Sequence, residues 1–72
     1  MVDTGENTRS KILTAAVTVF RERGKDGAKM QEIADQAGIN KAMLHYYFRS
    51  KDLLFEEVFK LTFIDFLSNN DL

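Results

Sequence analysis

A chain of 72 residues without cysteine or proline, carrying a formal net charge of −1 at pH 7, forms at most one small domain. The missing thiols exclude disulfides and thiolate metal sites, and they fit a reducing cytoplasm. No apolar run resembles a signal peptide or approaches the length of a membrane span, so we expect a cytoplasmic protein without a membrane partner.

The first predicted element is a helix that follows a polar arm. Residues 1–7 are polar and are expected to be flexible. Asn7 or Thr8 can cap a helix that Gly24 ends. Its apolar residues fall on one stripe at the helical period: Ile12, Leu13, Ala16, Val17 and Phe20. The sequence GKDG over residues 24–27 then predicts a short turn.

Two short helices are predicted on either side of Gly38, within about residues 29–48. The apolar residues of the first recur at i, i+3, i+4 and i+7: Met30, Ile33, Ala34 and Ala37. Gly38 suits the left-handed position that ends a helix, and Asn40 suits the cap that begins the next one. A helix, a tight turn and a second helix are the outline of a helix-turn-helix.

The second of these helices has two different sides. Leu44 and Phe48 share the side expected to face the core, with Tyr47 at its border. The opposite side is small, aromatic and basic, and it carries Ala42, Tyr46 and Arg49, flanked by Lys41, Met43 and His45. We therefore expect the opposite side to contact a partner.

A fourth helix is predicted from Lys51 to about Leu67, with Ser50 as its cap. Apolar residues cover nearly every side of it, more than a three-helix core can bury, so we expect dimerisation through it or a longer protein. Residues 1–51 hold nine basic against six acidic side chains, whereas residues 52–72 hold one against five. Two surfaces with different roles would explain this division, and so would ordinary solvation.

With these features, the chain resembles the N-terminal DNA-binding domain of TetR-family transcriptional regulators. The matching segments are TRSKILTAAVTVFRERG (8–24), IADQAGINKAMLHYYFRSK (33–51) and LLFEEV (53–58). Their most specific element is the helix-turn-helix followed by Tyr-Phe and, three residues after the Phe, a lysine. The expected fold is all-α: a homeodomain-like three-helix bundle over residues 8–50, and a fourth, linking helix within residues 51–72.

The resemblance implies sequence-specific binding of double-stranded DNA by the operator-reading domain of a regulator. It implies a homodimer on a pseudo-palindromic operator, with a further helical C-terminal domain that forms the dimer and binds a small-molecule effector. That the regulator is a repressor rests on the habit of the family alone. No cofactor and no metal are expected.

Some positions depart from the family pattern. Many members carry threonine or serine pairs at the start of the second helix, where this chain has Ala28 and Lys29 or Lys29 and Met30. A hydroxyl cap and a hydroxyl contact to phosphate are lost there, and the charge of Lys29 can replace the contact. Ala42 and His45 also replace more usual residues, which affects base preference rather than fold.

The candidate DNA contacts follow from laying the third helix in the major groove. They are Lys29, Gln31, Asn40, Lys41, Ala42, Met43, His45, Tyr46, Tyr47 and Lys51. Ala42 allows close approach, and Ala42 or Met43 can touch a thymine methyl. Lys41 can donate to guanine or phosphate, and the side chains of His45 and Tyr46 can reach base edges or the backbone.

Several of these residues have a second interpretation. The oxygen of Asn40 can cap its own helix instead of contacting DNA. The resemblance implies that the hydroxyl of Tyr47 contacts a phosphate, and its ring can also pack on the first helix. Lys51 and the free N–H groups of its helix can converge on one phosphate, or Lys51 can be a solvated surface lysine.

Two other classes of function fit the sequence less well. An enzyme is not expected, because the single histidine, His45, has no nucleophile or metal partner at a telling spacing. A small interaction or oligomerisation module is the competing class, favoured by the apolar fourth helix and by the net charge. The basic, small-residue side of the third helix argues against it.

Overall fold

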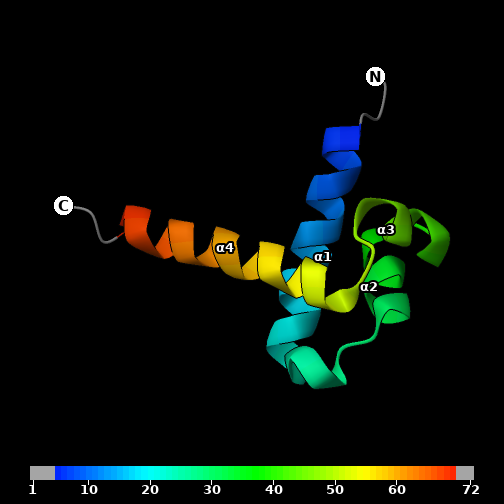
Figure 1. Cartoon of the computed structure of the whole chain (residues 1–72), viewed down its shortest axis with the longest axis horizontal. Coiled ribbons are helices and arrows are strands. Elements are labelled where there is room, and N and C mark those ends of the chain that lie inside the picture. Colours follow the sequence, from blue (N-terminus) through cyan, green and yellow to red (C-terminus); the bar gives the residue numbers. More distant parts are fainter. Residues whose placement is uncertain (1–4, 70–72) are drawn as a thin grey trace.

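The structure is a computed structural model that describes residues 5–69 as four helices and no strand. The helices are α1 (Gly5–Gly27), α2 (Met30–Ala37), α3 (Lys41–Tyr47) and α4 (Lys51–Asn69). In Figure 1, α2 and α3 lie together beside α1, and α4 crosses α1 and points away from them. The predicted all-α fold is thus confirmed. None of these four helices combines the length with the apolar character that a membrane crossing requires.

Helix α1 differs from its prediction at both ends. It begins at Gly5, before the expected caps at Asn7 and Thr8, so residues 5–7 of the expected arm are helical. Residues 1–4 of that arm lie outside the described residues. Gly24 does interrupt the helix, with φ 73° and ψ 168°, but a further helical turn follows and ends at Gly27. Because glycine tolerates a positive φ, the chain can change direction at Gly24 and still resume helical geometry.

All four helices contribute to one hydrophobic core, including the first two turns of α4. The buried apolar residues are Ile12, Leu13, Ala15, Ala16, Val19, Phe20, Ala28, Ile33, Ala34, Leu44, Phe48, Leu54 and Val58. Phe20 of α1 also meets Phe55 of α4 edge to face, with ring centroids 5.1 Å apart. The expectation of a core built by three helices was therefore incomplete, because Leu54 and Val58 of α4 close it.

The turn between α2 and α3 has the local geometry that its sequence predicts. Gly38 adopts the left-handed conformation, with φ 76° and ψ 28°. The N–H of Ile39 donates to the Ala34 carbonyl at 3.0 Å, and that of Gly38 donates to the Asp35 carbonyl at 3.2 Å. This is the Schellman pattern, and Ile39 packs against the core beneath it. The turn thereby fixes how α3 leaves α2.

The left-handed conformation of Gly38 predicts a cost for any side chain there. We expect Gly38→Ala to lower the free energy of unfolding by about 1 kcal/mol, because L-residues are strained in this region. A Cβ at Gly38 would meet no atom within 4 Å, so the loss would come from the backbone alone. Urea unfolding followed by circular dichroism measures the change.

Gly27→Ala is the matched control, since Gly27 lies in α1 without a positive φ. It should leave stability unchanged or raise it by up to about 1 kcal/mol, the helix-propensity difference between the two residues. Equal destabilisation by the two substitutions would contradict the role given to Gly38.

Candidate nucleic-acid interface

Helix α3 presents one side to solvent and the other to the core, as predicted. Leu44 is fully buried, and Phe48, directly after the helix, is buried beside it. The opposite side is exposed and comprises Lys41, Ala42, Met43 and Tyr46, with 81% of the Tyr46 surface accessible. The structure therefore leaves a small, aromatic and basic side of α3 available to a partner.

The two adjacent tyrosines have different surroundings. Tyr47 is half-buried and packs against the core. Tyr46 meets the Tyr47 ring edge to face, at a centroid distance of 5.3 Å. The exposed Tyr46 ring is thus in contact with Tyr47, which packs against the core. The contact of the Tyr47 hydroxyl with a phosphate stays a prediction.

Two polar candidates already make hydrogen bonds within the protein. Asn40 Oδ1 accepts from the Met43 N–H at 2.7 Å, which confirms Asn40 as the cap of α3. Gln31 Nε2 donates to Asp35 Oδ1 at 3.0 Å, one turn later in α2. Each amide retains an unused group, the Asn40 Nδ2 and the Gln31 Oε1, so their DNA contacts stay predictions.

Lys29 occupies the cap position of α2 without capping it. Its backbone is extended, and its side chain makes no hydrogen bond to the first turn of the helix. This agrees with the predicted loss of a hydroxyl cap at this position. The side chain is exposed, so its ammonium is available beside the first turn of α2.

His45 ties the end of α3 to the segment that follows it. Its Nδ1 lies 3.3 Å from the Arg49 carbonyl oxygen, four residues later. When Nδ1 carries the proton it donates to that oxygen, and Nε2 is left as an acceptor. The ring is half-buried, so His45 both fixes the backbone at residue 49 and offers one nitrogen at the edge of the exposed side.

Lys51 has a structural role that the sequence did not reveal. Its Nζ donates to the Ala28 carbonyl at 2.9 Å and to the Asp26 carbonyl at 3.4 Å. These bonds join the start of α4 to the last turn of α1 and to the segment that follows it. They also explain why a cation is tolerated at the positive end of a helix, since carbonyl oxygens surround the ammonium. The phosphate contact of Lys51 stays a prediction, for which the third N–H of the ammonium remains.

Ion pairing separates the basic residues into two groups. Four cations of α1 and α4 lie against carboxylates: Arg9 and Glu57 at 3.0 Å, Arg23 and Glu32 at 2.7 Å, Lys25 and Asp52 at 3.0 Å, and Lys60 and Glu57 at 3.7 Å. The hydrogen bond that Arg23 Nε donates to the Glu32 carboxylate raises the pKa of Arg23. Within residues 5–69, Lys29, Lys41 and Arg49 are exposed and make no side-chain ion pair or hydrogen bond.

This sorting concentrates uncompensated positive charge on one part of the molecule. Lys29 precedes α2, Lys41 begins α3, and Arg49 follows α3, so all three belong to the helix-turn-helix. Arg21 is also exposed without such a partner among the described residues, but it lies on α1 beside a separate groove. A chain with a net charge of −1 therefore presents three exposed cations without ion pairs around α2 and α3, within the described residues.

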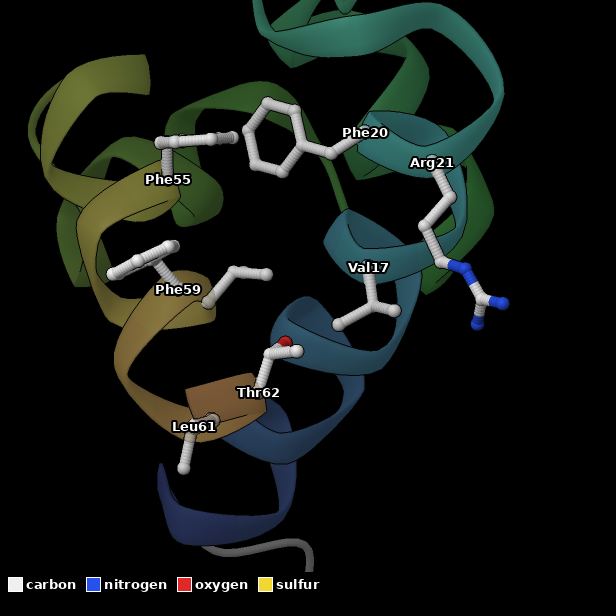
Figure 2. A pocket seen from close by; sticks show the side chains of 8 residues that line it. Val17, Phe20, Arg21, Phe55, Phe59, Leu61 and Thr62 are labelled. Atoms are coloured by element: carbon white, nitrogen blue, oxygen red, sulfur yellow. The ribbon is translucent and has the colours of Figure 1, made fainter. Parts of the chain in front are cut away.

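A second surface is apolar and lies between α1 and α4. Figure 2 shows the groove, lined by Val17, Phe20, Arg21, Phe55, Val58, Phe59, Leu61 and Thr62. Further along α4, Phe63, Ile64 and Leu67 are exposed, and the rings of Phe59 and Phe63 stack 6.4 Å apart. The prediction that α4 carries more apolar surface than the core can cover is confirmed.

Comparison with known proteins identifies relatives of this chain. Residues 12–58 match the family described as bacterial regulatory proteins, tetR family. The chain is 41% identical over 61 residues to IcaR of Staphylococcus aureus, the HTH-type negative transcriptional regulator of the biofilm operon icaADBC. It is 39% identical over 61 residues to the HTH-type transcriptional repressor NicS of Pseudomonas putida. These segments make up 85% of this chain but 32% and 29% of the two relatives.

A solved structure is similar in fold as well as in sequence. The crystal structure of a HlyIIR mutant protein superimposes with a TM-score of 0.77 and 49% sequence identity. The match covers 79% of this chain and 31% of that protein. The chain thus spans about a third of the length of the relatives that it matches.

The contacts of Lys51 predict a loss of stability when its charge is removed. We expect Lys51→Met to lower the free energy of unfolding by about 1.5 kcal/mol, because hydrogen bonds from a charged donor to two carbonyls are lost. For a domain of this size, that change lowers the melting temperature by roughly 6–12 °C. Thermal unfolding followed by circular dichroism measures it.

Lys60→Met is the matched control, since Lys60 is exposed and makes one ion pair with Glu57 within α4. A surface pair of this kind contributes about 0.3–0.5 kcal/mol, so the control should change stability little. Two variants of equal stability would show that the bonds of Lys51 to the carbonyls contribute nothing.

Proposed function

The chain belongs to the tetR family of bacterial regulatory proteins, and on this premise we propose that it reads an operator for a transcriptional regulator. The observation that carries the proposal is the exposed side of α3, with uncompensated cations around it. A helix-turn-helix places its second helix in the major groove, and α3 is that helix here. The double-stranded DNA would therefore lie against α3 and the first turn of α2.

The exposed residues of α3 suit base contacts. Ala42 and Met43 supply apolar surface for a thymine methyl, and Lys41 can donate to guanine O6 and N7 or to a phosphate. His45 offers a ring nitrogen, and Tyr46 offers a hydroxyl on a supported ring. These four chemistries together can distinguish base pairs, which a uniformly basic surface cannot do.

The remaining candidates suit contacts to the DNA backbone, which set register rather than sequence preference. Lys29 and Gln31 lie at the start of α2, and Tyr47 lies at the edge of the core with its hydroxyl available. Asn40 and Lys51 would contribute only through the donors left over from their hydrogen bonds within the protein. We therefore rank Lys29 and Tyr47 above them.

The family relationship supports a larger assembly. We propose a homodimer that binds a pseudo-palindromic operator, with a small-molecule effector bound in a further helical domain. The printed descriptions of IcaR as a negative regulator and of NicS as a repressor favour repression over activation. The exposed apolar side chains of α4 would then be covered by that further domain, and the protein would act in the cytoplasm.

A second candidate function rests on the same apolar surface. Phe59, Phe63 and Ile64 are exposed on α4, and such a patch favours association with another protein. In this case the chain would oligomerise or dock through α4 without binding DNA. Sedimentation with and without duplex DNA, for the chain and for its Lys41→Gln variant, separates the two functions. That substitution should weaken DNA binding and leave association through α4 unchanged.

DNA binding itself predicts a dependence on salt. We expect fluorescence anisotropy of a labelled duplex to show binding that weakens steeply between about 50 and 200 mM salt. The variant Lys29→Gln should bind more weakly, and its slope against log salt should be smaller by about 0.9, for one lost phosphate contact. Lys60→Gln, on α4, is the control that keeps the slope. No salt-sensitive binding by a folded chain would refute the proposal.

Dimeric operator recognition predicts that one reading head binds weakly. Two copies of the chain joined by a flexible linker should bind a two-site duplex more tightly than one copy does, by a factor of roughly 10²–10⁴. The second contact then becomes intramolecular, which is the origin of the gain. The same affinity for linked and single copies, on half-sites about one helical turn apart, would argue against paired heads.

A further inference from the structure

We propose that Arg49 is a further DNA-contact residue, which anchors a phosphate at the junction between α3 and α4. The inference rests on the proposed DNA-binding function and assigns one more residue to it. Arg49 lies between the end of α3 at Tyr47 and the start of α4 at Lys51. Among the described residues, its side chain makes no hydrogen bond and no ion pair.

The backbone around Arg49 directs its side chain outward. Phe48 is extended, with φ −134° and ψ 111°, and its ring is buried in the core. In extended backbone, successive side chains point to opposite sides, so the next residue faces solvent. Arg49 is indeed exposed. Because Phe48 is fixed in the core, the outward direction of Arg49 is fixed with it.

A hydrogen bond also holds the base of this side chain against α3. The Arg49 carbonyl oxygen lies 3.3 Å from Nδ1 of His45. Tyr46, three residues before Arg49, is the most exposed aromatic residue of the segment. Arg49 therefore continues the exposed side of α3 directly after its last turn.

The charges nearby leave Arg49 as the available cation of the junction. Lys51 directs its ammonium to the Ala28 and Asp26 carbonyls, on the inner side of the junction. Lys25 is paired with Asp52 at the start of α4. Among the residues described around this junction, Arg49 alone keeps a cation that is exposed and unpaired.

The chemistry of guanidinium and the place of Arg49 both favour a phosphate over a base. Arginine binds phosphate through two parallel N–H donors, which gives the contact a defined geometry. In helix-turn-helix proteins the N-terminal part of the recognition helix reads the bases, and in a homeodomain the C-terminal end of that helix contacts the backbone. Arg49 follows the C-terminal end of α3, whereas Lys41 begins it.

The test compares two exposed arginines that lack ion pairs and sit on different surfaces. Arg49→Gln and Arg21→Gln remove the same charge from the same residue type, but Arg21 lies on α1 beside the apolar groove (Figure 2). Anisotropy of a labelled duplex is measured with each 72-residue variant from about 50 to 200 mM salt, after circular dichroism shows that each is folded. The readout is the slope of log affinity against log salt.

We expect Arg49→Gln to lower the slope by about 0.9, so that its loss of affinity over this range is roughly 3-fold smaller than for the unmodified chain. Arg21→Gln should keep the slope, and Arg49→Lys should largely restore it. If the unmodified chain binds DNA with a steep slope that Arg49→Gln does not change, the role of Arg49 is overturned while the proposed function stands. If the unmodified chain shows no salt-sensitive binding, both are overturned.

Discussion

The burial of one side of α3 is the constraint on which the rest of this domain depends. A helix of seven residues is far too short to be stable in water by itself. Leu44 and Phe48 hold it against the other helices, and the Asn40 cap satisfies an N–H at its start. The side that faces solvent does not contribute to the core, so Ala42, Met43 and Tyr46 are available to contact a partner.

The first two turns of α4 belong to the same core as the other three helices. Leu54 and Val58 close the core, and Lys51 bonds the carbonyls that precede α2. Two cations of α1 make further contacts. Arg9 pairs with Glu57, and its guanidinium carbon lies 5.3 Å from the centre of the Phe48 ring. Lys25 pairs with Asp52, and its Nζ lies 5.4 Å from the centre of the Phe55 ring. Exposed ion pairs contribute little stability each, so the burial in the core dominates. A shift of the first two turns of α4 would therefore change the contacts that hold the start of α2 and the end of α3.

Ion pairing decides which cations can serve DNA binding, and the net charge does not. Three carboxylates of α2 and α4 pair with Arg9, Arg23, Lys25 and Lys60, since Glu57 contacts both Arg9 and Lys60. The exposed cations around α3 have no such partner among the described residues. A chain with a slight excess of acidic residues can thus present unpaired cations beside α3, since several of its carboxylates pair with cations of α1 and α4. The apolar groove between α1 and α4 is a separate surface with separate chemistry.

The sequence by itself determined the features that depend on neighbours within a few residues. The Gly38 turn, the Asn40 and Ser50 caps and the two sides of α3 are all present as predicted, because each is fixed by hydrogen bonds or spacing over three or four residues. The start of α1 and the turn after Gly24 were misplaced, since helix ends depend on weak competing preferences.

Only the tertiary structure decided what the long side chains do. Lys51 bonds carbonyls 23 and 25 residues earlier, and Arg9 meets a carboxylate 48 residues later. No local pattern announces such partners, because folding alone brings them within reach. For this reason the sequence could predict the exposed side of α3. It could not show that Lys51 bonds backbone carbonyls, or that the Arg49 side chain has no ion pair among the described residues.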